Sequence, residues 1–397
     1  MKDIHNYRKR LERIIRKIEN SCISKRNRKI IMQFHDFCFS QGLSIAKIER
    51  YLFDLHKFAQ MLKKDLSKAT KQDIQSIIAK VERSEWSPHT KHGFKVLVKK
   101  FYKWLEGIDE KGIYPERVRW INTTIKSNKN KLPEELLDES EINKMIRQCR
   151  DERDRAFISV LYESGCRISE IGTLRIKDIS FDRYGARISI SGKTGARIIR
   201  VISSVPYLQE WLNKHPSNDD PNSYVWIKKK SKELLSYTRL SAILRKAGKR
   251  AGIKKRIYPH LLRHSRATYL AKHLTEAQIK EYLGWTQSSR MPAIYVHLSG
   301  RDTDSAILKL YGIKLEDNSK ETQELKPKVC ARCNTSNEAT NKFCKTCGMI
   351  LDSNMREEII KNELKREKLN RIMNELIKDA EFYNLLIKKV KERSIEI

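Results

Sequence analysis

The chain has 397 residues, 82 of them Lys or Arg and 49 Asp or Glu, which gives a formal net charge of +33. This length allows two or three domains, and the charge favours a polyanionic partner, nucleic acid before a membrane surface. The sequence contains no run of about eighteen apolar residues and no apolar signal segment at its N-terminus. We therefore expect a cytoplasmic protein that acts on nucleic acid, and neither a membrane-spanning nor a secreted one.

Residues 1–28 form the first predicted segment, and they are strongly basic. Leu11, Ile14, Ile15 and Ile18 recur at helical spacing, which predicts an amphipathic helix. Two interpretations remain open for this helix. It packs on the next domain, or it contacts DNA directly.

Residues 29–107 carry four helical patterns of apolar residues, which predict a small helical domain. The last pattern begins at Ser87-Pro88, a good N-cap and first helical residue. The opposite face of this last helix is basic, and a helical domain with one basic face suits a clamp on a DNA backbone. The polar, lysine-rich residues 108–133 are predicted to be a linker. The predicted DNA contacts are His89, Thr90, Lys91, Lys95 and Lys99.

Residues 134–314 form the second predicted domain, which starts with the helix signal Asp138-Glu-Ser-Glu141. A β-hairpin is predicted over residues 187–203, with Lys193 on its turn. The other periodic segments of this domain predict helices. The predicted fold class is therefore mainly α with a small antiparallel β-sheet, an α+β fold.

Residues 257–299 are unusually rich in side chains that handle phosphate. His260 and Arg263 lie three residues apart on a predicted helix, so they share one face. Trp285 and Tyr295 follow within the same stretch, and His264 and His297 flank the group. A cation, an imidazole and a phenol presented together suit a phosphate ester better than a core. For His264 and His297 we prefer a packing or capping role.

The cysteines fall into two groups. Residues 329–352, which follow a predicted linker at 315–328, contain the pattern C-x2-C-x10-C-x2-C. Four thiolates at this spacing predict a tetrahedral Zn²⁺ site in a zinc ribbon. Four protein ligands leave no open coordination position, so we expect a structural site or a binding platform. Its ligands are Cys330, Cys333, Cys344 and Cys347, whereas Cys22, Cys38, Cys149 and Cys166 are interpreted as small buried hydrophobes.

Residues 353–397 are predicted to form one long amphipathic helix. Its apolar residues alternate by four and three, as in a coiled-coil seam. Self-association through a coiled coil and packing onto the ribbon or the second domain both remain open. The seam consists of Leu369, Met373, Leu376, Ala380, Tyr383, Ile387 and Val390.

Several of these motifs together resemble the tyrosine recombinase (phage integrase) family, and the archaeal members most of all. The resemblance covers residues 137–312 and the preceding helical domain, which is similar to the family's core-binding domain. The C-terminal ribbon and helix fall outside the common family pattern. The matching motifs are SGCRISEIGTLRIKDI with Arg167, SGKTGARIIRV with Lys193, HLLRHS with His260 and Arg263, YLGW with Trp285, and IYVHLSG with Tyr295.

The resemblance implies a site-specific DNA recombinase that uses Tyr295 as nucleophile and forms a 3′-phosphotyrosyl intermediate. Arg167 and Arg263 would stabilise charge on the phosphate oxygens. The remaining implied roles are a hydrogen bond or proton transfer from His260, general acid catalysis by Lys193, a hydrogen bond from Trp285 and support of Arg167 by Glu170.

The resemblance also implies partners and cofactors. The partner is double-stranded DNA, bound by a homo-tetramer. No cofactor is needed for catalysis, because arginines take the place of a metal ion, so strand cleavage should survive EDTA. Integration, excision and chromosome-dimer resolution all fit this activity. The alternatives are a DNA-binding protein with a spent catalytic site and a type IB-like topoisomerase with the same chemistry.

Overall fold

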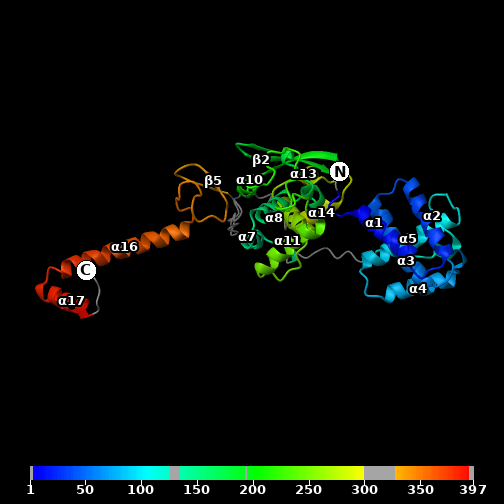
Figure 1. Ribbon diagram of the computed structural model, residues 1–397, viewed down its shortest axis with the longest axis horizontal. Helices are drawn as coiled ribbons and strands as arrows, with labels where there is room; N and C mark the ends of the chain where they lie inside the picture. The colour runs from blue at the N-terminus through cyan, green and yellow to red at the C-terminus, as the bar shows by residue number, and fades with distance from the viewer. Residues whose placement is uncertain (1–2, 126–134, 193–194, 299–326, 393–397) are drawn as a thin grey trace, which may run out of the picture. The chain divides into compact units, whose positions relative to one another are not determined.

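The computed structural model of the protein describes residues 3–125, 135–192, 195–298 and 327–392. The chain divides into two compact units (Figure 1), the first made of residues 1–132 with 235–239 and the second of residues 133–234 with 240–397. Within the described residues, no helix combines the length and the apolar character needed to cross a membrane.

The first unit is a bundle of helices around one apolar core. Phe34, Phe58, Phe94 and Phe101 lie fully buried at its centre. The predicted start of the last long helix is confirmed, because the Ser87 side chain accepts the Thr90 N–H. The helices are α1 (Tyr7–Glu19), α2 (Lys25–Ser40), α3 (Ile45–Leu62), α4 (Lys71–Arg83), α5 (Pro88–Leu105) and α6 (Glu116–Arg119), with the 3-10 turn η1 (Leu66–Lys68) after α3.

Two predicted boundaries in this unit are wrong. The N-terminal helix α1 packs against α3, and its Leu11, Ile14 and Ile18 belong to the common core, so residues 1–28 are no separate segment. The predicted linker 108–133 contains α6, whose Val118 is fully buried in the same core. The apolar stripe of α1 was recognised in the sequence but not the helix on which it packs, and the four residues of α6 are too few to show a period. Of the two interpretations of α1, the structure therefore shows packing on the helical domain.

The second unit combines helices with a three-stranded antiparallel sheet in the order β1-β2-β3. The predicted hairpin is confirmed as β2 and β3, whereas β1 was not predicted because its four residues are mostly exposed and show no clear alternation. The helices are α7 (Glu139–Arg147), α8 (Glu152–Ser164), α9 (Ile168–Gly172), α10 (Val205–Asn213), α11 (Tyr237–Arg250), α12 (Pro259–Ala271), α13 (Glu276–Leu283) and α14 (Met291–Leu298), the 3-10 turn is η3 (Ile176–Asp178), and the strands are β1 (Ile179–Asp182), β2 (Gly185–Gly192) and β3 (Gly195–Val201).

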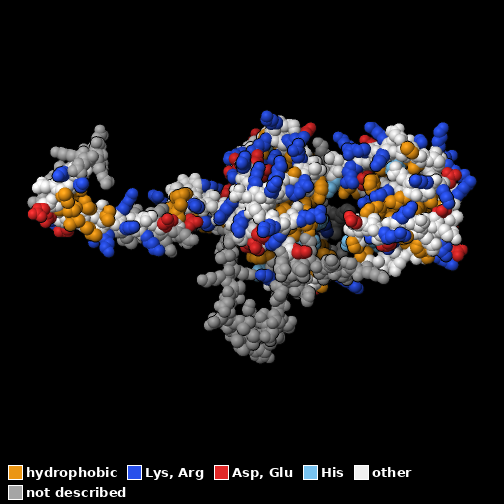
Figure 2. All heavy atoms as spheres, turned by 90° about the horizontal axis from the view of Figure 1, so that it is seen from below, with side chains coloured by type: hydrophobic (Ala, Val, Ile, Leu, Met, Phe, Trp, Pro, Cys, Tyr) orange, Lys and Arg blue, Asp and Glu red, His pale blue; other side chains and the backbone are white. Residues whose placement is uncertain are grey.

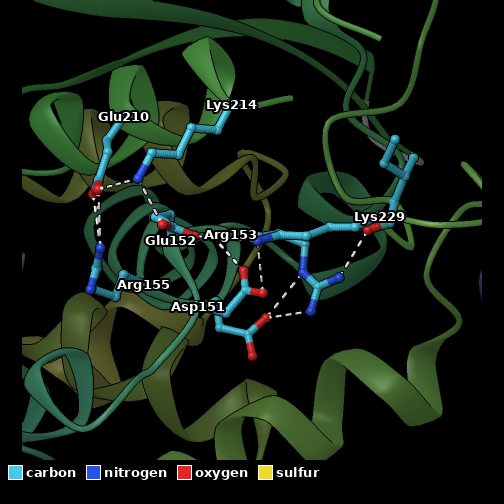
Figure 3. Close-up of polar contacts among 9 residues, drawn as sticks. Asp151, Glu152, Arg153, Arg155, Glu210, Lys214 and Lys229 are labelled. Carbon is cyan, nitrogen blue, oxygen red and sulfur yellow. Dashed lines mark hydrogen bonds and ion pairs between the residues drawn. The ribbon is translucent and has the colours of Figure 1, made fainter. Parts of the chain in front are cut away.

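Helix α8 is the central element of the second unit. Its Glu163 carboxylate accepts three backbone N–H groups, from Ile202, Ser203 and Ser204, at 2.7–3.0 Å, and so holds the corner between β3 and α10. Ion pairs at the other end of α8 attach α10 and the loop that follows it (Figure 3). These pairs are Arg155–Glu210 at 3.0 Å, Lys214–Glu152 at 2.7 Å and Lys229–Asp151 at 3.0 Å.

The C-terminal part holds a two-stranded sheet, β4 (Lys328–Val329) with β5 (Ser336–Asn337), and two helices. The prediction of one continuous helix is wrong, because α16 (Ser353–Leu376) and α17 (Ala380–Glu392) are separate (Figure 1). The Asp379 side chain accepts the Phe382 N–H at 2.9 Å and begins the second helix. The predicted heptad seam is therefore interrupted. Hydrophobic side chains gather near this break (Figure 2), with Leu369 59% exposed.

Candidate active site

The two predicted arginines come from different segments, Arg263 from within α12 and Arg167 from the residue before α9, and they are held in distinct ways. Arg263, on α12, is 5% exposed and donates to the Gly165 and Leu283 carbonyl oxygens at 2.8 and 2.9 Å. Burial, and then the charge of Arg167, lower the pKa of Arg263 to about 10, so it stays protonated at neutral pH. Arg167 precedes α9 and donates to the Glu170 carboxylate at 2.9 Å. Both guanidinium groups are thus fixed before any substrate binds.

Glu170 also binds a residue that the sequence did not reveal. Arg197, on β3, forms a 2.9 Å ion pair with Glu170 and donates to the Tyr282 carbonyl oxygen at 3.0 Å. Its guanidinium leaves no room for a side chain at Gly284, where a Cβ would lie 2.5 Å from Arg197 Nη1 and the φ is +63°. The left-handed φ favours glycine at this position of the LGW motif, and a side chain there would displace the Arg197 guanidinium. Arg197 is a positioning residue that acts through Glu170.

The predicted nucleophile Tyr295 lies on α14 and is 3% exposed. The Trp285 ring stacks on its ring, with centroids 5.5 Å apart and planes at 11°. The Tyr295 hydroxyl forms a hydrogen bond with His264 Nδ1, from α12. Burial raises the pKa of Tyr295 to about 12, so the phenol is protonated at neutral pH. His264, for which a packing or capping role was preferred, therefore contacts the hydroxyl oxygen of the predicted nucleophile.

His260 lies one helical turn before His264 on the same face of α12, with ring centroids 6.3 Å apart. Its ring is partly desolvated and lies near Arg263 and Arg167, and these effects, in that order, lower the pKa of His260. A neutral imidazole beside two arginines can donate a hydrogen bond to a phosphate oxygen.

Two predicted residues cannot be placed fully. Lys193 lies outside the described residues, as does the side chain of His297. The hairpin on either side of Lys193 is described: Gly192 pairs with Gly195, and a Cβ at Gly192 would lie 2.6 Å from Glu170 Oε1. The base of the turn therefore lies against the carboxylate that holds Arg167.

On the predicted DNA-contacting face of α5, all three lysines already contact other groups of the protein. Lys95 lies 2.8 Å from the Glu82 carboxylate, and Lys91 donates to the Glu82 carbonyl oxygen. Lys99 donates to the Ile121 carbonyl oxygen at 3.2 Å. His89 is exposed and Thr90 partly so. A phosphate would have to compete with these contacts for the three lysines, and the Lys95 side chain is only 13% exposed.

The four predicted metal ligands come together. The sulfur atoms of Cys330, Cys333, Cys344 and Cys347 all lie within 4.8 Å of one another. After each C-x-x-C pair the chain takes a left-handed turn, at Asn334 with φ 53° and at Gly348 with φ 72°. Sulfur separations of 3.5 Å match the edges of a small tetrahedral site. The cluster can therefore hold one metal ion through four thiolates.

Comparisons with known proteins find similarity over the region that holds this site. Residues 135–301 match the phage integrase family. A tyrosine recombinase XerA of Pyrococcus furiosus is 29% identical over 283 residues, which cover 70% of this chain and 93% of that protein.

Two solved structures share the fold. One is XerH site-specific recombinase bound to palindromic difH substrate, with a TM-score of 0.55, 21% identity and coverage of 78% of this chain and 98% of that one. The other is a lambda integrase tetramer bound to a Holliday junction, with a TM-score of 0.54, 17% identity and coverage of 70% and 78%. Tyr295, Arg167, Arg263, His260 and Trp285 all lie within residues 135–301, the part of the chain that matches the phage integrase family.

Proposed function

We propose that this protein is a site-specific DNA recombinase that cuts and rejoins DNA strands through a covalent bond to Tyr295. The observation that carries the proposal is that three separate segments of the second unit supply a buried phenol and two guanidinium groups held by hydrogen bonds. The Arg263 guanidinium lies 5.3 Å from the centre of the Trp285 ring, which stacks on Tyr295. The named relative from Pyrococcus furiosus is a tyrosine recombinase, which supports the same activity here. The recombinase works in the cytoplasm, where it meets chromosomal or mobile DNA.

The cleavage step forms one bond and breaks one bond at phosphorus. The Tyr295 oxygen attacks the scissile phosphate, the bond from phosphorus to the 5′ oxygen breaks, and a 3′-phosphotyrosyl ester remains. Arg167 and Arg263 bind the non-bridging oxygens as their negative charge grows, and His260 adds a hydrogen bond. Attack by a 5′-hydroxyl reverses the step and rejoins the strand.

The leaving 5′ oxygen needs a proton, and we assign this task to Lys193. The support is the position of Gly192 against Glu170, next to the arginine that binds the phosphate. Trp285 takes the place of a histidine found in many family members. Its indole N–H can donate a hydrogen bond but cannot transfer a proton.

The remaining parts of the chain have supporting roles in this proposal. The four cysteines hold Zn²⁺, which stabilises the ribbon and leaves no open position for catalysis. Double-stranded DNA is the partner, and His89, Thr90, Lys91, Lys95 and Lys99 contact its backbone. The active assembly is a homo-tetramer, as in the lambda integrase tetramer bound to a Holliday junction.

The test is to trap the covalent adduct. A nicked suicide substrate made from the DNA that flanks the gene is incubated with the protein, and the adduct is separated on a denaturing gel. Tyr295→Phe should form no adduct and keep DNA binding. Tyr184→Phe, at an exposed tyrosine of the β1–β2 turn, should react like the wild type.

The other outcomes separate the alternatives. Absence of an adduct with the wild-type protein on every flanking sequence would favour a DNA-binding protein with a spent site. Relaxation of any supercoiled plasmid, without a preferred site, would favour a topoisomerase.

A further inference from the structure

The hydrogen bond between His264 and Tyr295 has a chemical consequence for the cleavage step. A phenol that is protonated at neutral pH must lose its proton as its oxygen attacks phosphorus. Among the described contacts of the Tyr295 hydroxyl, the nearest proton acceptor is the Nδ1 atom of His264. The two rings lie stacked, with centroids 5.8 Å apart and planes at 28°. The contact therefore joins the reacting oxygen to a basic nitrogen.

The tautomer that this contact needs is an ordinary one. When the His264 proton is on Nε2, Nδ1 carries a lone pair and accepts the phenolic O–H. The side chain is half-buried on α12, where Arg263 lies one residue earlier and is itself buried. The positive charge of Arg263 also favours the phenolate form of Tyr295, against the effect of burial. The surroundings thus support proton loss from the phenol.

His260 is less suited to this task. It is an exposed residue, and the described contacts include no hydrogen bond from it to Tyr295. It lies beside the charges of Arg263 and Arg167, at the position where the phosphate oxygens would bind. The two histidines lie four residues apart on one helix face but near different groups. His264 contacts the Tyr295 hydroxyl, and His260 lies beside the arginines that would bind the phosphate.

We propose that His264 is a catalytic residue that accepts the phenolic proton of Tyr295 during strand cleavage and returns it during rejoining. This inference rests on the proposed recombinase function. In cleavage, the phenolic proton moves to Nδ1, the bond from the Tyr295 oxygen to phosphorus forms, and the bond to the 5′ oxygen breaks. The 5′ oxygen takes its own proton from a separate acid. In rejoining, the imidazolium of His264 protonates the departing phenolate, so every proton is accounted for.

The experiment measures single-turnover cleavage of the suicide substrate by the full chain. His264→Asn keeps an amide at the position of Nδ1, so it can accept the hydrogen bond but not the proton. Its cleavage rate should fall by about 10²- to 10⁴-fold, the usual contribution of a general base, with DNA binding unchanged. His264→Ala should show a similar loss, part of which added imidazole restores. His273→Asn, at an exposed histidine just after α12, is the matched control and should cleave normally.

A second substrate separates the two proton transfers. With sulfur in place of the bridging 5′ oxygen, the leaving group needs no proton. This substrate should restore cleavage by Lys193→Ala but not by His264→Asn. Full restoration of His264→Asn would overturn the proposal, because His264 would then act on the leaving group.

The other contrary results are equally direct. Cleavage by His264→Asn within about threefold of the wild type would show that the proton leaves by another route. Loss of cleavage in all His264 variants without rescue by imidazole would assign His264 a packing role. Neither result touches the recombinase function, which depends on adduct formation by the wild-type protein.

Discussion

The Arg197 guanidinium and the Glu170 carboxylate form an ion pair of 2.9 Å in which the side chains are only 10% and 4% exposed. The same carboxylate binds Arg167, which faces the proposed phosphate site. One buried carboxylate thus joins a strand of the sheet to an arginine of the active site. The geometry of Arg167 depends on a residue that touches no substrate.

Replacement of Arg197 by Met should destabilise the protein. A buried carboxylate that loses its partner costs about 3–5 kcal/mol, and we expect the lower end because Arg167 still pairs with Glu170. The measurement is urea unfolding, followed by circular dichroism. Arg200→Met removes the exposed partner of Asp182 on the same strand and should change stability little. Equal effects of the two substitutions would contradict the structural role of Arg197.

The stabilising effect of Glu170 should depend on pH. Burial raises the pKa of Glu170, but the hydrogen bond and charge of Arg197, with the contacts to Arg167, outweigh it and leave the pKa below its ordinary value of 4.5. A carboxyl group with a lowered pKa in the folded state stabilises the fold above the unfolded pKa. This stabilisation is lost as the pH falls from 4.5 through the folded pKa.

The comparison of wild type with Glu170→Gln tests this dependence. The difference in unfolding free energy between the two proteins should be largest at neutral pH and should shrink towards about pH 3. Unfolding by urea at a series of pH values gives this difference directly. A difference that stays constant over the series would show that the carboxylate charge is not the source of the stabilisation.

The cysteine cluster should hold one zinc ion per chain. A double Cys344→Ser and Cys347→Ser variant should lose the metal, because two thiolates cannot complete a tetrahedral site. Metal content by mass spectrometry and hydrogen exchange of residues 327–352 measure the two effects, loss of zinc and loss of protection. Cys22→Ser is the control and should retain zinc, because Cys22 lies in the first unit and is exposed, not buried as the sequence indicated. A zinc-free wild-type protein with a protected ribbon would contradict the prediction.

The basic face of α5 should contribute to DNA affinity without sequence preference. Each phosphate contact that is removed lowers the slope of log K against log salt by about 0.9. A Lys95→Ala, Lys99→Ala double variant should therefore bind every duplex more weakly, with a shallower salt dependence. Lys80→Ala, at an exposed lysine of α4, is the control. An unchanged slope would place the DNA contacts of the first unit on another face.

Much of the local structure follows from the sequence alone. The helix start at Ser87-Pro88 was predicted as observed, and the hairpin was predicted with its two strands on either side of Lys193. The cysteine array is likewise readable from its spacing. Each of these features lies within one short segment of the chain, where helical periodicity, a hairpin turn or cysteine spacing can be recognised directly in the sequence.

Tertiary structure decided the rest. Arg197 meets Glu170 across 27 residues and His264 meets Tyr295 across 31, and no periodicity records such contacts. Helix α1 buries its apolar face against α3, and the sequence did not identify α3 as the helix on which it packs. The sequence alone determined which residue types are available for phosphate chemistry. Only the packing of α12 against α14 brings His264 Nδ1 into hydrogen-bond contact with the Tyr295 hydroxyl. Burial and distance of this kind are properties of the folded chain.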